Sequence, residues 1–89
     1  MSAFVVTYDL GGPLENYPGL ISRLQSYVNN WHCQESCWIV GPAQSAFDVA
    51  ETLRQELGGN DQLFVQRITE ESAWWGYPDQ LRDWILSVR

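Results

Sequence analysis

The chain has 89 residues, of which 45% are hydrophobic, and it carries eleven acidic against five basic residues. A chain of this length forms one small domain, and its hydrophobic content excludes intrinsic disorder. The formal charge of −6, with no lysine at all, disfavours a nucleic-acid partner, because such surfaces need clustered cations. The sequence offers no membrane span and no signal peptide, so the two cysteines predict a reducing, cytoplasmic setting.

The first half of the chain predicts a strand, a helix and a second β segment. Residues 3–10 are rich in β-formers and end at the breaker Gly11-Gly12-Pro13. Apolar residues then recur at helical spacing from Tyr17 to Val28, with Asn16 as the expected cap. Residues 31–40 are again rich in β-formers.

The second half predicts a helix, a strand and a final helix. Ser45 and Asp48 resemble a capping box, and the helix that they open ends at Gly58-Gly59. Residues 61–69 form the next strand, and Pro78 starts a C-terminal helix. The apolar stripe of that last helix consists of Leu81, Trp84, Ile85 and Val88.

This order of elements predicts an α+β fold. If residues 31–40 fold as a hairpin, or as one bent strand that pairs on both sides, the order becomes βαββαβ. That is the ferredoxin-like arrangement, with one four-stranded antiparallel sheet and here an extra C-terminal helix. We expect a single domain over residues 1–89, with a core at 3–69 and an extension at 70–89. A Rossmann-like fold is disfavoured, because no glycine-rich phosphate loop follows the first strand.

The first strand is apolar on both sides, which raises the question of what covers its second face. Two helices can cover only one face of a four-stranded sheet, so the third helix or a second chain must cover the other. A homodimer is the more economical solution for so small a domain. One side of the strand carries Phe4, Val6, Tyr8 and Leu10, and the other carries Val5, Thr7 and Asp9.

Residues 31–38 read WHCQESCW and could form a metal site, a thiol site or an ordinary strand. On an extended strand Cys33 and Cys37 would lie roughly 13 Å apart, which excludes a disulfide and a shared zinc ion. A metal site would need a turn between them, so we expect two packed thiols that bind no metal. His32 would point to the opposite face, where a structural hydrogen bond is its expected role.

Trp74 and Trp75 are adjacent, in a segment expected to be extended. Successive side chains of an extended segment point to opposite faces, so both cannot enter one core. One of them should lie on the surface or at an interface.

Two short patterns resemble a known group of proteins. The segment VVTYDL ends in Tyr8-Asp9, and the second β segment carries Gln34, Ser36, Cys37 and Trp38. These patterns resemble the small CRISPR-associated nucleases that partner the spacer integrase, and their relatives among the virulence-associated VapD-type ribonucleases. In that group the first strand ends in hydrophobic-Tyr-Asp, and the second β segment reads Gln-x-Ser-hydrophobic-aromatic. An acidic residue precedes the final core strand, as Asp61 does here, so the resemblance covers residues 3–69.

The resemblance implies a ferredoxin-like homodimer with Asp9 of each chain near the two-fold axis, where it would bind Mg²⁺. It makes Asp9 and Ser36 the candidate catalytic residues and Asp9 the candidate metal ligand. Two symmetry-related carboxylates can hold one hard cation together with water. From the residues alone, an aspartate before Gly-Gly-Pro can equally serve as a hydrogen-bond acceptor in a turn.

Three functions follow from these observations. We favour a dimeric interaction or architectural module, because an acidic chain with exposed tryptophans suits a protein partner. The alternative is a Mg²⁺-dependent endonuclease, in particular a ribonuclease, that uses Asp9 at the dimer axis. A third is a small-molecule-binding dimer, or cofactor-free oxygenase, with a pocket between its helices and sheet.

Overall fold

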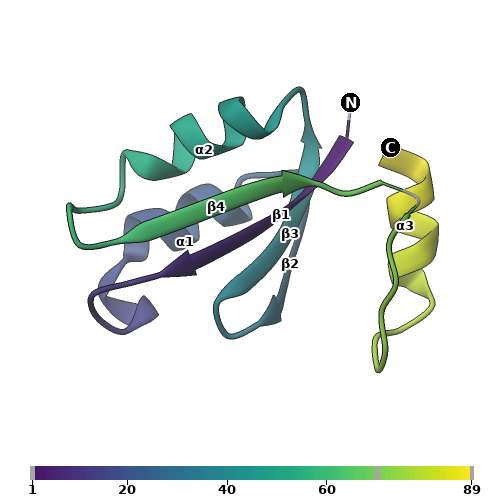
Figure 1. The fold of residues 1–89 in the computed structure, drawn as a ribbon, viewed down its shortest axis with the longest axis horizontal. Helices are drawn as coiled ribbons and strands as arrows, with labels where there is room; N and C mark the ends of the chain where they lie inside the picture. Colours follow the sequence, from purple (N-terminus) through teal and green to yellow (C-terminus); the bar gives the residue numbers. More distant parts are fainter. Residues whose placement is uncertain (1, 70, 89) are drawn as a thin grey trace.

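A computed structural model describes residues 2–69 and 71–88 and shows four strands, three α-helices and one short 3₁₀ helix in that range (Figure 1). The strands are β1 (Ser2–Asp9), β2 (Asn29–Gln34), β3 (Cys37–Ala43) and β4 (Gln62–Arg67). The helices are the 3₁₀ helix η1 (Leu14–Asn16), α1 (Pro18–Gln25), α2 (Ala46–Arg54) and α3 (Gln80–Val88).

The four strands form one antiparallel sheet in the order β2-β3-β1-β4. With α1 between β1 and β2, and α2 between β3 and β4, this is the predicted ferredoxin-like α+β fold. Residues 31–40 therefore belong to a hairpin, and its turn consists of Glu35 and Ser36. Of the two arrangements left open for this segment, the hairpin is the one adopted.

The main core lies between the sheet and the pair of helices α1 and α2. The alternation along β1 sends Phe4, Val6 and Tyr8 into this core, as predicted. Helix α1 contributes Leu20 and Leu24, and α2 contributes its own two buried residues. The nine buried residues of the main core are Phe4, Val6, Tyr8, Leu20, Leu24, Trp38, Val40, Val49 and Leu53.

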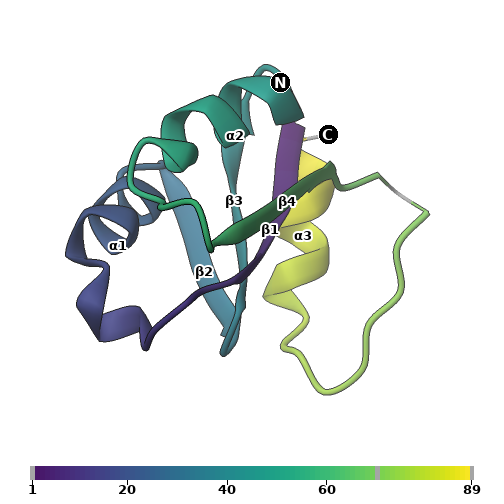
Figure 2. The same ribbon diagram turned by 60° about the vertical axis from the view of Figure 1, so that its left-hand side comes forward.

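Helix α3 packs against the opposite face of the sheet, where it forms a second, smaller core. Figure 2 shows α3 across the sheet from α1 and α2. Leu81 and Ile85 of α3 are buried against Ala3, Ile39 and Ile68. The sequence left open whether the C-terminal helix or a second chain covers this face. In the structure, the C-terminal helix covers this part of it. The side chain of Val88, also expected on this stripe, lies outside the described residues.

The first helix is shorter than predicted. It begins after Tyr17, which occupies the cap position without a side-chain hydrogen bond, and Asn16 belongs to the preceding η1. The predicted cap at Asn16 is therefore wrong. The helix ends at Gln25, so Val28 is not part of its stripe and is 86% exposed, because β2 starts at the next residue.

Two local predictions are confirmed. Ser45 caps α2, where its hydroxyl accepts a hydrogen bond from the backbone N–H of Asp48 at 3.0 Å. Of the adjacent tryptophans, Trp75 is 96% exposed, whereas Trp74 packs against the second core.

None of the described helices is both long and apolar enough to cross a membrane.

Candidate functional site

The two candidate residues Asp9 and Ser36 lie at the same end of the sheet. Asp9 is the last residue of β1, and Ser36 belongs to the β2–β3 turn. Both line one hollow of about 140 Å³, which we call the Asp9 hollow. Glu35 and Pro13 also line it. The fold therefore brings together the residues that the resemblance picked out.

Tyr8 holds the β2–β3 turn against the end of β1. Its backbone N–H donates to the carbonyl oxygen of Ser36 at 3.2 Å, and its hydroxyl donates to the carbonyl oxygen of Glu35 at 3.3 Å. The same hydroxyl accepts a hydrogen bond from Nε1 of Trp38 at 3.0 Å. Burial raises the pKa of Tyr8, so the phenol stays protonated and keeps its role as a donor.

His32 is a structural residue at this turn, as predicted. Its Nε2 lies 3.0 Å from the carbonyl oxygen of Glu35, which makes Nε2–H the donor. Its ring stacks on Trp38 with the ring centroids 4.5 Å apart and an interplanar angle of 7°. Both contacts fix the turn, and neither points the imidazole into the Asp9 hollow.

The Asp9 hollow is acidic. Asp9 and Glu35 are the charged residues among those that line it, and no arginine is among them. The described residues contain no group of three or more His, Cys, Asp or Glu side chains placed to hold a metal ion. In the Mg²⁺ hypothesis, the Asp9 of a second chain would supply a further carboxylate, and water the remaining ligands.

On the other side of the β1 end lies a strip of sheet that α3 does not cover. Thr7 is paired with Phe64 in the β1–β4 ladder, and Asp9 with Gln62, so all four share one face. They line a second hollow, of about 350 Å³. We call these four residues the open strip. Phe64 is its apolar centre, with 62% of its surface exposed on the edge strand β4.

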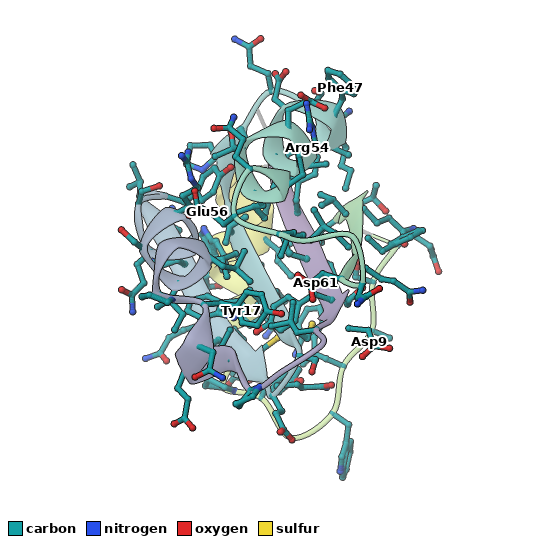
Figure 3. The ribbon with its side chains drawn as sticks, turned by 90° about the vertical axis from the view of Figure 1, so that its left-hand side faces the viewer. Asp9, Tyr17, Phe47, Arg54, Glu56 and Asp61 are labelled. Atoms are coloured by element: carbon teal, nitrogen blue, oxygen red, sulfur yellow. The ribbon has the colours of Figure 1, made fainter. Side chains whose placement is uncertain are left out.

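Asp61 has a structural role that the sequence did not reveal. Its Oδ1 accepts hydrogen bonds from the backbone N–H of Gly11 and from the hydroxyl of Tyr17, each at 2.8 Å. Its Oδ2 accepts one from the backbone N–H of Gly58 at 2.7 Å. The turn-acceptor role suggested for Asp9 therefore belongs to Asp61, which lies beside Tyr17 in Figure 3.

These hydrogen bonds shift the titration of both side chains. The backbone N–H groups of Gly11 and Gly58, followed by the Tyr17 hydroxyl, lower the pKa of Asp61. The hydrogen bond to Asp61 in turn raises the pKa of Tyr17. By contrast, the exposed Asp9 carboxylate makes no hydrogen bond or ion pair with other described residues. Asp9 is free to meet a ligand or a second chain.

The two cysteines are much closer together than expected. Cys33 Sγ lies 3.4 Å from Cys37 Sγ and 3.4 Å from the carbonyl oxygen of Cys37, and both residues are free thiols. The predicted separation of roughly 13 Å is wrong, because the turn at Glu35 and Ser36 folds the segment back on itself. The prediction assumed one extended strand.

The cysteines also line a third hollow, of about 440 Å³, which lies between the sheet and the segment that leads to α3. Gln34 closes part of this space by donating a hydrogen bond to the hydroxyl of Tyr77 at 2.7 Å. Tyr77 also makes an edge contact with Trp31, with ring centroids 4.9 Å apart. We call this space the thiol cavity.

Comparison of this chain with protein-family models, with curated proteins and with solved structures finds no match. The similarity to the CRISPR-associated and VapD-type nucleases rests on the quoted residues alone and stays a prediction.

Proposed function

We propose that the protein is a homodimeric interaction module, in which two chains meet through the open strip. The observation that carries the proposal is Phe64. This aromatic side chain is 62% exposed in the middle of an edge strand, next to a hollow that a second copy can fill. Aromatic residues in such positions dominate the binding energy of interfaces.

The position of the open strip also explains why the predicted dimer and the observed α3 cover are compatible. Helix α3 covers the part of the sheet around Ala3 and Ile39. The open strip begins further along β1, at Thr7. The second face of the sheet is therefore divided between α3 and, in the proposal, the second chain. Other surface aromatics, Phe47 on α2 and Trp75, remain available to a protein partner.

The dimer is tested by replacing Phe64 with glutamine, the residue found two positions before and two positions after it on the same edge. We expect the wild-type chain to have about twice its 10.2 kDa mass in size-exclusion chromatography with light scattering. Loss of a central aromatic anchor costs about 2 kcal/mol or more, so Phe64→Gln should weaken the dimer about 30-fold.

The matched control is Phe47→Gln. Phe47 is a second exposed phenylalanine, 71% accessible, and Figure 3 shows it near the top of the view, away from Asp9. Its replacement should leave the dimer intact. A wild-type chain that stays monomeric at high concentration, or two variants that weaken the dimer equally, would contradict the proposal.

A Mg²⁺-dependent endonuclease is the second candidate, and the Asp9 hollow is the observation that favours it. Asp9 and Ser36 share that hollow, and Asp9 also belongs to the open strip. A dimer through the open strip would therefore bring the two Asp9 carboxylates towards each other, as the resemblance implies. Two like charges held close together destabilise a metal-free dimer.

Asp9→Asn separates the two candidates. If the Asp9 pair binds Mg²⁺, the substitution should raise the melting temperature of the metal-free protein and abolish the stabilisation that Mg²⁺ gives to the wild type. Melting curves of both proteins with and without Mg²⁺ measure this. Equal curves in all four samples would remove the nuclease hypothesis and leave the interaction module untouched.

A further inference from the structure

The two thiols of the β2–β3 hairpin have no part in the open strip or the Asp9 hollow. Their sulfur atoms are in contact, at 3.4 Å, and both residues are half-buried. We propose that Cys33 and Cys37 form a site of thiol–disulfide exchange, at which a low-molecular-weight disulfide converts the pair into an intrachain disulfide.

A one-residue irregularity in the hairpin creates this contact. The β2–β3 ladder pairs Trp31 with Ile39 but Gln34 with Cys37, so the register shifts by one residue between these pairs. If the pairing of Trp31 with Ile39 is continued by two residues along each strand, Cys33 lies opposite Cys37. Gln34 is paired with Cys37 as well. Two residues opposite one define a β-bulge. The bulge places the two cysteines opposite each other, so their side chains lie on one face.

The geometry favours a bond between the sulfurs. A disulfide needs a separation of about 2.0 Å, so sulfurs at 3.4 Å must approach by about 1.4 Å, a displacement that side-chain rotation can supply. The thiols also line the thiol cavity, whose volume of about 440 Å³ gives a small disulfide room to enter. The backbone thus supplies proximity, and the cavity supplies access.

The reaction consists of two exchanges. The deprotonated Cys33 Sγ attacks one sulfur of the disulfide R–S–S–R, the S–S bond breaks, and R–S⁻ leaves and takes up a proton. Cys37 then loses its proton and attacks Cys33 Sγ, and a second R–S⁻ leaves and is protonated. The balance is two protein thiols and one disulfide in, one protein disulfide and two R–SH out.

The order of the two steps follows from the environment of Cys37. Burial and the hydrogen bond to Cys33 raise the pKa of Cys37 to about 12, so it is almost entirely a neutral thiol near neutral pH. Since the thiolate is the nucleophile, Cys33 is the expected attacking residue and Cys37 the resolving one. Zinc is a poorer occupant, because the described residues around the pair provide no third ligand.

The experiment treats the reduced 89-residue chain with oxidised glutathione, quenches with an alkylating agent and measures the intact mass. The expected product is a chain lighter by about 2 Da, the mass of two hydrogens, without accumulated glutathione adduct. Cys37→Ser should stop at the mixed disulfide on Cys33. Cys33→Ser should react more slowly than Cys37→Ser, because burial still raises the pKa of the remaining Cys37 thiol.

A comparison of the native protein with the same protein in concentrated urea tests whether the fold makes the pair. The equilibrium constant for the intrachain disulfide should be at least about tenfold larger in the native state, which corresponds to about 30 mV in reduction potential. Equal constants in the two states, a wild-type protein that accumulates mixed disulfide, or disulfides formed only between chains would each overturn the proposal.

Discussion

Replacing Leu81 with aspartate is expected to remove α3 from the sheet or to unfold the chain. Leu81 is 4% exposed in the second core, where it packs with Ile85 and Ile39. Truncation of a buried leucine alone costs about 2–5 kcal/mol, and an unpaired buried carboxylate adds to this. A domain of this size has about 4–13 kcal/mol of total stability, so the melting temperature should fall by at least about 10 °C.

The control for this prediction is Gln80→Asp, which introduces the same carboxylate one residue earlier, at an exposed position in the first turn of α3. An acid near a helix N-terminus is neutral or slightly stabilising, so this variant should melt like the wild type. Thermal unfolding followed by circular dichroism measures both. If the two variants melt at the same temperature, α3 is not the cover of the sheet.

The fold was predictable because each element carries its own local signal. The alternation of Phe4, Val6 and Tyr8 with Val5 and Thr7 fixed the faces of β1, and the structure confirms this division. The cap of α2 was equally local, since Ser45 needs only the N–H of a residue three positions on. The spacing of apolar residues is enough to predict an element whose structure depends on its own local sequence.

The hairpin shows where such reasoning stops. No Asn-Gly or Asp-Gly pair marks its turn, which consists of Glu35 and Ser36, so residues 31–40 could also be interpreted as one strand. Besides the contact from His32, two hydrogen bonds that fix this turn come from Tyr8, which lies 27 residues before Glu35 in the sequence. The predicted distance between the two cysteines depended on this turn and was therefore wrong, although the sequence had singled out Cys33 and Cys37 as a pair to examine.

Asp61 was missed for a similar reason. Its three donors come from Gly11, Tyr17 and Gly58, and two of these lie more than 40 residues away in the sequence. The sequence shows an acidic residue before a strand and two Gly-Gly pairs in loops. Nothing in it indicates that this acid accepts hydrogen bonds from those loops. The proximity of Asp9 and Ser36, by contrast, follows from the topology, because the end of β1 and the β2–β3 turn lie at the same end of the sheet.

Asp61→Asn is expected to lower the melting temperature well below that of the wild type and of Asp9→Asn. An asparagine must present its NH₂ group either to the N–H of Gly58 or to the donors on Gly11 and Tyr17, so at least one hydrogen bond becomes a contact between two donors. The substitution also removes the negative charge that strengthens all three hydrogen bonds. Asp9→Asn removes a carboxylate without hydrogen bonds to other described residues and is the matched control.

The effect should depend on pH with a definite sign. The folded-state pKa of Asp61 lies below its ordinary value of 3.8, chiefly because the N–H groups of Gly11 and Gly58 stabilise the carboxylate. A group with a lowered pKa contributes stability that is fully present above that ordinary value and is lost as the pH falls through the folded-state pKa. Thermal melts from about pH 6 down to about pH 2 should therefore show the difference between wild type and Asp61→Asn shrinking below about pH 4. A difference that stays constant over this range would mean that the negative charge of Asp61 contributes nothing to stability, and that its contacts with Gly11, Tyr17 and Gly58 do not depend on that charge.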